Sequence, residues 1–229
     1  MERYEALIFK EYPDFDMLVM DVASALANDL SEALHHEDRV LFAVPGGTTP
    51  GPVFDALSVA DLDWERVDIC PTDERWVPEI NPRSNARLIK ERLLVNRAMA
   101  ARFLPLYASA LQPEDVLAEL EAMIAPKLPL AVALLGMGAD MHTASLFPKA
   151  QGLEKALSEN APILVPVRRE DLPETRVTLS ARVLDGAMRK HLLIQGEDKR
   201  IALEKARKLR AKEAPIQSVL DGANVHWTV

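Results

Sequence analysis

The stretch LAVALLGMGADMHTASLFP, residues 130–148, decides the fold. It opens with six consecutive apolar residues, a run typical of a strand that is covered on both faces in a parallel sheet. A loop with two glycines and one histidine follows the run directly. Ligands of open α/β sheets sit outside the carboxyl ends of the strands. The stretch therefore predicts a buried parallel strand that ends at a ligand site.

Segments of two kinds alternate along the rest of the chain. Short apolar runs at 39–44 and 67–70 predict buried strands. Residues 14–34 carry Leu, Val and Phe at helical spacing behind Asp14, which suits a helix N-cap. Strands that alternate with helices predict an α/β fold with a mostly parallel sheet. Further strands are expected at 102–106, 163–167, 176–179, 191–195 and 224–227, and further helices at 84–95, 113–125 and 197–212.

Nothing in the composition marks a domain boundary, a membrane segment or a secretory signal. The chain has no repeat and no low-complexity linker, so we expect one domain over residues 1–229. Met1–Pro13 lacks the basic and apolar pattern of a signal peptide. The longest nearly apolar run, 130–138, is far shorter than the ~20 residues of a membrane span. Because the single cysteine, Cys70, also fits a reducing compartment, we expect a cytoplasmic protein that does not associate with a membrane.

The chain is acidic, with 27 basic and 35 acidic residues and a net charge of −8. This balance disfavours nucleic acid as a partner, because proteins that bind nucleic acid present a basic face. The basic residues of 197–212 are interleaved with acidic ones, which indicates a solvated helix face. An anionic small molecule would therefore need a local group of Arg and Lys.

Two other segments follow expected strands and share features of a ligand site. PGGTTP, residues 45–50, combines glycines with threonine hydroxyls. Such a loop suits a phosphate, because glycines admit a close approach and the start of a helix offers free N–H groups. It is not a Walker loop, since no Gly-Lys-Ser/Thr follows, and a tight strand-to-helix turn is the alternative. Residues 71–75 gather three charges, and all three loops share one sheet edge if their strands are parallel.

The second glycine loop contains His142. An imidazole has an ordinary pKa of about 6.5, which suits proton transfer near neutrality, and Asp140 could fix its tautomer. A histidine with a structural or surface role is the alternative. Gly136-x-Gly138 begins like a dinucleotide fingerprint, but Met141 replaces its third glycine, so NAD binding is not expected. The histidines show no metal-ligand spacing, and no Gly-x-Ser-x-Gly elbow of a serine hydrolase occurs.

Four blocks of the sequence resemble the lactonase branch of the glucosamine-6-phosphate isomerase/6-phosphogluconolactonase family. They are GGTTP at 46–50, DER at 73–75 with Ser84-Asn85, LGMGADMHTASLFP at 135–148 and RVTL at 176–179. The resemblance implies the three-layer α/β sandwich of the sugar-phosphate isomerases. It also implies hydrolysis of 6-phospho-D-glucono-1,5-lactone to 6-phospho-D-gluconate in the pentose phosphate pathway, by a monomer, without a cofactor or a metal.

The resemblance further implies roles for residues of these blocks. His142 would be the general base that deprotonates water, and Asp140 would orient it. Arg75, Arg176 and Lys199 are the candidate cations, and it stays open which of them takes the phosphate and which faces the carbonyl. A structural salt bridge is the alternative for each. The expected substrate-binding residues are Gly46, Gly47, Thr48, Asp73, Arg75, Asn85, Arg176 and Lys199.

Two positions depart from the family pattern. Met141 stands where a glycine is usual. If that position needs a positive φ, methionine strains the loop, and if it only needs space, methionine narrows the pocket. Pro45 stands where a serine is usual, which removes a hydroxyl and an N–H from the first loop.

Two other functions stay open beside the lactonase. The isomerase/deaminase branch has a counterpart of the third block that ends in Asn-Glu-Pro, whereas this chain has Leu146-Phe147-Pro148. A deaminase of that branch would release ammonia from glucosamine 6-phosphate. The other alternative is a non-catalytic sugar-phosphate sensor. Such sensors usually carry a DNA-binding helix-turn-helix, and we expect no room for one ahead of the first helix.

Overall fold

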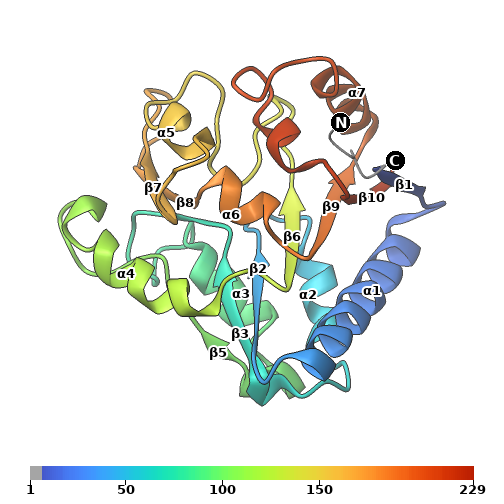
Figure 1. The fold of residues 1–229 in the computed structure, drawn as a ribbon. Helices are drawn as coiled ribbons and strands as arrows, with labels where there is room; N and C mark the ends of the chain where they lie inside the picture. The colour runs from blue at the N-terminus through green and yellow to red at the C-terminus, as the bar shows by residue number, and fades with distance from the viewer. Residues whose placement is uncertain (1–6) are drawn as a thin grey trace.

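A computed structural model describes residues 7–229, and a seven-stranded sheet lies at its centre (Figure 1). Residues 1–6 of the N-terminal stretch without a signal pattern lie outside the described residues. All neighbouring strands of this sheet pair in parallel, which confirms the predicted sheet type. The strands lie in the order β1 (Ile8–Glu11), β10 (Asn224–Thr228), β9 (Arg189–Gln195), β6 (Val132–Gly136), β2 (Val40–Val44), β3 (Val67–Pro71) and β5 (Arg102–Phe103).

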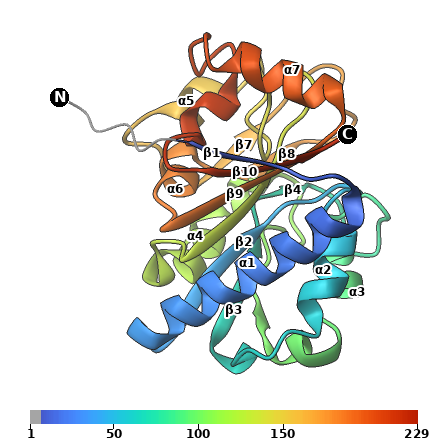
Figure 2. The same ribbon diagram turned by 90° about the vertical axis from the view of Figure 1, so that its right-hand side faces the viewer.

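Layers on both faces of the sheet complete the three-layer sandwich, which Figure 2 shows from the side. One face is covered by α1 (Phe15–His36), α2 (Gly51–Ser58) and α3 (Asn85–Arg92). The other face is covered by α4 (Leu117–Ile124), α5 (Leu153–Leu157), α6 (Ala181–Asp185), α7 (Glu197–Ala206) and a small second sheet. Short 3₁₀ helices lie at η1 (Trp64–Arg66), η2 (Asn96–Ala100), η3 (Pro113–Asp115), η4 (Ala125–Lys127) and η5 (Pro215–Val219).

The first helix forms where the sequence predicts it. Asp14 caps α1, because its side chain accepts a hydrogen bond from the Met17 N–H at 2.8 Å. The apolar stripe of α1 is buried against the sheet and α2, while the rest of the helix surface faces solvent. Burial of this stripe, more than helix propensity, holds α1 in place.

The small sheet is a feature that the sequence analysis missed. Its strands lie in the order β4 (Asp73–Arg75), β8 (Arg176–Leu179) and β7 (Leu164–Val167), and they pair antiparallel. The expected strands 163–167 and 176–179 therefore exist, but outside the main sheet. Residues 73–75, expected as part of a loop, are a strand instead. The three residues of β4 are too few to show a periodic pattern, and their partner lies about a hundred residues later in the chain.

Several expected elements are shorter than predicted. The expected strand 102–106 is confined to β5, although Leu104 and Leu106 are buried beyond its end. The expected helix 113–125 divides into η3 and α4, and the expected helix 197–212 ends at Ala206. β1 was not predicted, because its four residues at the sheet edge are all exposed and lack an apolar pattern.

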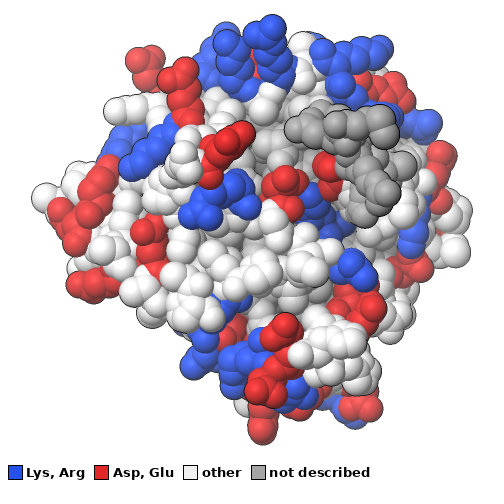
Figure 3. All heavy atoms as spheres, in the orientation of Figure 1, with Lys and Arg blue, Asp and Glu red and all other residues white. Residues whose placement is uncertain are grey.

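Figure 3 shows Lys and Arg side chains interspersed with Asp and Glu over one face of the molecule. This mixture agrees with the solvated surface that the charge pattern predicts. No helix among residues 7–229 is both long enough and apolar enough to cross a membrane.

Candidate active site

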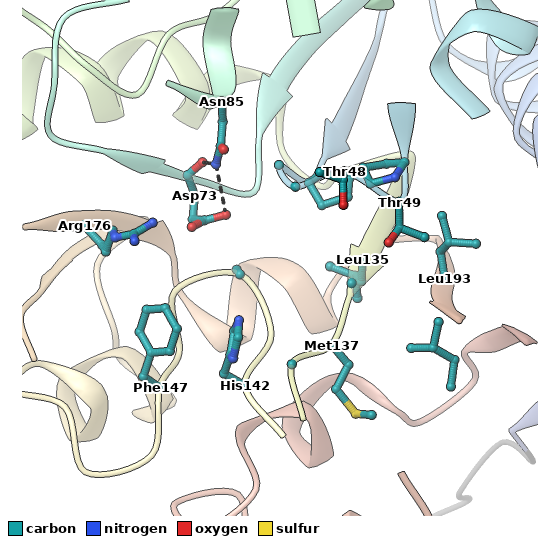
Figure 4. A pocket seen from close by; sticks show the side chains of 18 of the residues that line it. Thr48, Thr49, Asp73, Asn85, Leu135, Met137, His142, Phe147, Arg176 and Leu193 are labelled. Carbon is teal, nitrogen blue, oxygen red and sulfur yellow. Dashed lines mark hydrogen bonds between the residues drawn. The ribbon is translucent and has the colours of Figure 1, made fainter. Parts of the chain in front are cut away.

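The carboxyl ends of β2, β6 and β9 open into a pocket of about 470 Å³, which Figure 4 shows from close by. The loops that follow these three strands line it together with β4, β8 and the start of α3. One predicted residue, Asp140, does not line the pocket but is bonded to His142. The predicted residues that line the pocket are Gly46, Gly47, Thr48, Asp73, Arg75, Asn85, His142, Arg176 and Lys199.

His142 and Asp140 form a hydrogen-bonded pair in the loop after β6. The distance from His142 Nδ1 to Asp140 Oδ1 is 2.5 Å. The hydrogen bond from His142 and a second one from Arg169 lower the pKa of the Asp140 carboxyl well below its usual range. Since an ionised carboxylate can only accept, Nδ1 carries the proton and Nε2 of the neutral ring keeps its lone pair. The pair has the tautomer that a general base at Nε2 needs.

Gly138 is required by the close packing of this pair. A β-carbon at Gly138 would lie 2.1 Å from His142 Nδ1 and 2.6 Å from Asp140 Oδ1. The Gly138 N–H donates to the His142 carbonyl oxygen at 3.0 Å, so the loop folds back on itself. Gly136, by contrast, has open space where its β-carbon would be. Gly138 makes room for the pair, and Gly136 leaves the end of the strand uncovered.

Met141 has a φ of 65°, in the left-handed region. Its side chain packs against the hydrophobic cluster around the small sheet, and Met141 is not among the described residues that line the pocket. Of the two effects considered for this departure, the positive φ is therefore the one that the structure shows. The narrowing that applied only if this position merely needed space is not seen, because Met141 does not line the pocket.

The two glycines of the first loop serve different purposes. A β-carbon at Gly46 would lie 1.9 Å from Asn85 Oδ1, so Gly46 lets Asn85 pack against the loop. Asn85 in turn donates from Nδ2 to the Asp73 carbonyl oxygen at 2.7 Å. Gly47 has a φ of 93°, and nothing lies within 4 Å of its missing side chain. The positive φ of Gly47 thus fits the tight-turn interpretation, while Gly46 makes room for the Asn85 side chain.

Asp73 ties the small sheet to the loop that carries His142. Its side chain is almost fully buried and accepts a hydrogen bond from Ser145 Oγ at 2.5 Å. The neighbouring Glu74 is buried as well and accepts from the Asn85 and Ala86 N–H groups at 2.7 Å each. Burial raises the pKa of Glu74, although these N–H groups favour its charged form. Glu74 therefore anchors the start of α3, a role that the sequence analysis did not assign.

Arg75 and Arg176 lie directly opposite each other on β4 and β8. Arg176 is buried, and both burial and the nearby Arg75 charge lower the pKa of its guanidinium. Glu174 lies 3.8 Å from Arg176 and 3.1 Å from Arg83. Within the described residues, Nε of Arg75 and Nε of Arg176 have no hydrogen-bond partner. The two adjacent guanidiniums both line the pocket, and their positive charges are suited to hold an anion there.

Lys199 reaches the pocket from the other side of β6. It lies in the first turn of α7, directly after β9 and Gly196, whose φ is 94°. Since β9 and β2 flank β6 in the sheet, Lys199 and the first glycine loop border the loop of His142 from opposite strands. The pocket therefore has one group of cations on the small sheet and another cation at the start of α7.

The sequence analysis missed two side chains of the site. Arg169 lines the pocket and donates from Nη1 to Asp140 Oδ2 at 3.0 Å. Phe147 packs against the imidazole, with 4.5 Å between the ring centroids of Phe147 and His142. The only signal for Arg169 in the sequence is its place after the expected strand 163–167. Phe147 belongs to a recognised block but carries no reactive group.

The family model of glucosamine-6-phosphate isomerases/6-phosphogluconolactonase matches residues 13–227. The chain belongs to this family. A 6-phosphogluconolactonase of Mesorhizobium japonicum is 42% identical over 216 residues, covering 93% of this chain and 90% of that relative. One of Pseudomonas aeruginosa is 37% identical over 211 residues, covering 90% of this chain and 88% of that relative.

Solved structures of the family have the same fold. A crystal structure of a 6-phosphogluconolactonase from Shewanella baltica has a TM-score of 0.94, is 32% identical, and covers 99% of each chain. A monomeric glucosamine-6-phosphate deaminase has a TM-score of 0.78 at 16% identity, with 97% of this chain and 96% of the deaminase covered, which shows only that the fold is shared. The lactonase structure from Shewanella baltica thus shares both sequence and fold with the chain.

Proposed function

We propose that the protein hydrolyses 6-phospho-D-glucono-1,5-lactone to 6-phospho-D-gluconate in the pentose phosphate pathway, with His142 as the general base. The observation that carries this proposal is the position of the His142 imidazole, which is bonded to Asp140 and lines the same pocket as the glycine loop and the cations. The chain also aligns with about nine-tenths of the length of two relatives named 6-phosphogluconolactonase, which supports the same substrate for this protein.

The reaction needs only water, a base and charge stabilisation. His142 Nε2 takes a proton from water while the water oxygen attacks C1 of the lactone, and the carbonyl electrons move onto the carbonyl oxygen. The C1–O5 bond then breaks, and the imidazolium returns the proton to O5. General acid–base catalysis of this kind contributes about 10²–10⁴-fold to the rate.

The phosphate is assigned to the end of the pocket near α7. The backbone N–H groups of Gly47 and Thr48 precede α2, and Lys199 lies in the first turn of α7. Free N–H groups at helix starts favour an anion, and a lysine adds a point charge. Because these groups belong to strands on both sides of β6, a phosphate held there places the sugar across the loop of His142.

The developing oxyanion is assigned to Arg75 and Arg176. Both belong to the small sheet, which is bonded to the loop of His142 through Asp73 and Ser145. That connection keeps the guanidinium pair close to the reacting carbonyl. The same pair would then hold the carboxylate of the product, because the C1 carboxylic acid formed on ring opening loses its proton to solvent and its oxygens carry a negative charge.

We also infer that residues 1–229 act as one domain, as a monomer and in the cytoplasm. Both hydrophobic clusters pack on the same seven-stranded sheet, and a single chain supplies the pocket lining described above. The mass of the protein in solution tests whether it is a monomer. A mass larger than that of one chain, together with a KM that changes on dilution, contradicts the inference.

The decisive test replaces His142 with Ala and follows lactone loss above the spontaneous rate in buffer. We expect kcat to fall by about 10²–10⁴-fold, while His35→Ala, an exposed histidine of α1, leaves it unchanged. Near-normal turnover by His142→Ala removes the base from its role. Ammonia release from glucosamine 6-phosphate indicates the deaminase instead, and tight binding of 6-phosphogluconate without turnover indicates a sensor.

Two further substitutions separate the ends of the pocket. Lys199→Ala should raise KM more than it lowers kcat, because the phosphate is held equally in the ground and transition states. Arg176→Ala should lower kcat more than it raises KM, since its charge acts on the oxyanion. Steady-state kinetics of both variants check this, and the reverse pattern exchanges the two assignments.

A further inference from the structure

Arg169 is a cation of the pocket to which the proposed reaction assigns no role. It follows β7 by two residues, and its side chain is one-quarter exposed. Its guanidinium donates to Asp140 Oδ2 from Nη1 at 3.0 Å. On its other edge, Nε and Nη2 donate to the two oxygens of Asp171 at 2.6 and 2.9 Å. The guanidinium is thus held between two carboxylates.

The same guanidinium also contacts the aromatic neighbour of His142. Its central carbon lies 4.6 Å from the centroid of the Phe147 ring. The Phe147 ring lies 4.5 Å from the His142 ring, centroid to centroid, at an angle of 43°. Asp140 and Phe147 are both side-chain neighbours of His142, and Arg169 contacts both. The four side chains form a closed ring of contacts.

We propose that Arg169 is a positioning residue that holds the His142–Asp140 pair in its reactive geometry. The ring and the backbone N–H of His142 both bond to Oδ1 of Asp140, and because the terminal torsion of an aspartate is broad, these bonds to one oxygen leave Oδ2 without a fixed position. Arg169 binds the second oxygen of Asp140 and so fixes the first oxygen toward His142 Nδ1. The Arg169 guanidinium also packs over the Phe147 ring and so holds in place the ring that packs against His142. The proposal rests on the role of His142 as the base.

The donors of Arg169 argue against a role in gripping the phosphate. A guanidinium has five N–H donors, and it binds phosphate best through two parallel N–H groups on one edge. In Arg169 the edge formed by Nε and Nη2 is already used by Asp171. One N–H of Nη1 is used by Asp140. Three of the five N–H groups of Arg169 are thus already bonded to carboxylates, which makes Arg169 less suited to grip a phosphate.

The charge of Arg169 has a second, measurable effect on His142. A cation bonded to Asp140 opposes the formation of the imidazolium, so its removal makes protonation of His142 easier. The acid limb of the kcat/KM profile should then move to higher pH. The other titratable groups that line the pocket, Asp73, Arg75, Arg176 and Lys199, are unchanged in such a variant. A side chain with a purely structural role would leave this limb where it is.

The experiment compares Arg169→Gln and Arg169→Lys with Arg168→Gln. Arg168 is a matched control, because its guanidinium forms the same kind of ion pair with Glu114 outside the pocket. For Arg169→Gln we expect kcat to fall by up to about 10²-fold, KM to stay within about twofold, and the acid limb to move to higher pH. Arg169→Lys keeps the charge but cannot bond to both carboxylates in the same geometry. The acid limb of its kcat/KM profile should therefore lie at the wild-type pH, while its kcat should recover only in part.

Arg169→Ala supplies a readout that does not depend on stability. Guanidinium ion added at low concentration should raise its kcat, whereas sodium chloride at the same ionic strength should not. Arg168→Ala should show no such rescue. Only a folded variant can be rescued, so a gain in kcat that is specific to guanidinium supports the role of Arg169 even if Arg169→Gln fails to fold.

Three results overturn the proposal. They are unchanged kcat in Arg169→Gln, a raised KM with unchanged kcat, and an unmoved acid limb together with absent rescue. Wild type and His142→Ala are measured alongside. If wild type does not hydrolyse the lactone, the proposed function fails, whereas an active wild type with an inactive His142→Ala and a normal Arg169→Gln defeats the role of Arg169 alone.

Discussion

Met141 holds a backbone conformation that residues with a β-carbon rarely adopt, next to the proposed catalytic base. The left-handed region costs such a residue roughly 1–2 kcal/mol. Met141 stays there because its N–H donates to the Gly138 carbonyl oxygen at 2.9 Å and its carbonyl oxygen accepts from Ile216 at 3.0 Å. Its side chain also packs on the hydrophobic cluster. The surrounding contacts thus hold a strained residue that shapes the site.

This strain predicts an inverted order of stability at position 141. Alanine is ordinarily more stabilising than glycine, by about 0.4–1 kcal/mol, because it restricts the unfolded chain. At Met141 the positive φ penalises every β-carbon, so the free energy of unfolding of Met141→Gly should exceed that of Met141→Ala by about 1 kcal/mol, as urea titration would show. Both variants should keep the wild-type KM, since the side chain does not line the pocket.

The control for this prediction is a position with ordinary helical backbone. Ala27, in the middle of α1, should lose about 1 kcal/mol when replaced by Gly. If Met141→Ala proves more stable than Met141→Gly, the left-handed conformation at this position is wrong.

At the scale of elements, a buried carboxylate at the start of β3 joins three segments of the chain. Asp68 is fully buried and accepts from Arg39, Arg102 and Lys127 at 2.8 to 2.9 Å. Burial disfavours its charge, but the hydrogen bonds from Arg102 and Lys127 prevail and lower the pKa of Asp68. The cluster ties together β3, β5, η4 and the residue before β2. It lies at the end of β3 opposite the pocket.

Removal of this carboxylate should destabilise the fold without altering the chemistry. Asp68→Asn leaves three converging cations with no counter-charge, and because their side chains are 20% to 52% exposed we expect a loss of about 1–3 kcal/mol in the free energy of unfolding. The exposed pair of Asp61 and Arg97 serves as the control, and Asp61→Asn should change stability by less than about 1 kcal/mol. Urea titrations measure both, and kcat per folded molecule should be unchanged. A loss for Asp68→Asn as small as that for Asp61→Asn would contradict the role of the cluster.

The elements show what can and cannot be predicted from this sequence. β6 and α1 are predictable because an apolar run and an apolar stripe report burial directly. The pairing of β4 with β8 is not, since the register that sets Arg75 against Arg176 depends on residues a hundred positions apart. Likewise, a glycine loop and a histidine point to a site, but only packing reveals Arg169, whose sequence surroundings resemble any charged surface segment.

At the scale of the whole molecule, a chain of hydrogen bonds joins the two ends of the polypeptide. Tyr12 OH bonds to Asp21 and lies 2.8 Å from His226 Nδ1, and His226 Nε2 lies 3.0 Å from His191 Nδ1. His191 Nε2 then lies 2.7 Å from Asp29 on α1. Burial, then His191 and Lys10 of β1, lower the pKa of His226 to about 3. The described start of the chain, α1 and the last strand are thus linked through a neutral buried imidazole.

This link predicts acid sensitivity of the fold. An unfolded histidine titrates near pH 6.5, so the stabilisation from neutral His226 is complete above about that pH and is lost as pH falls toward 3. By pH 5 the loss should reach about 2 kcal/mol. His226→Gln should lower stability at pH 7 and flatten its decline between pH 7 and pH 5. Urea titrations at both values check this, with exposed His35→Gln as the control, and an equally steep decline in His226→Gln would refute the link.

The two sheets give the pocket a property that no single loop could confer. The phosphate-binding groups proposed above belong to loops of the parallel sheet, while the guanidinium pair belongs to the small sheet packed on it. The distance between these two groups is set by core packing. We expect this distance to select lactones by the number of carbons between the phosphate and the carbonyl. With the phosphate and oxyanion positions proposed above, we expect a lactone one carbon shorter to be hydrolysed with a lower kcat/KM, because it could not reach both positions at once.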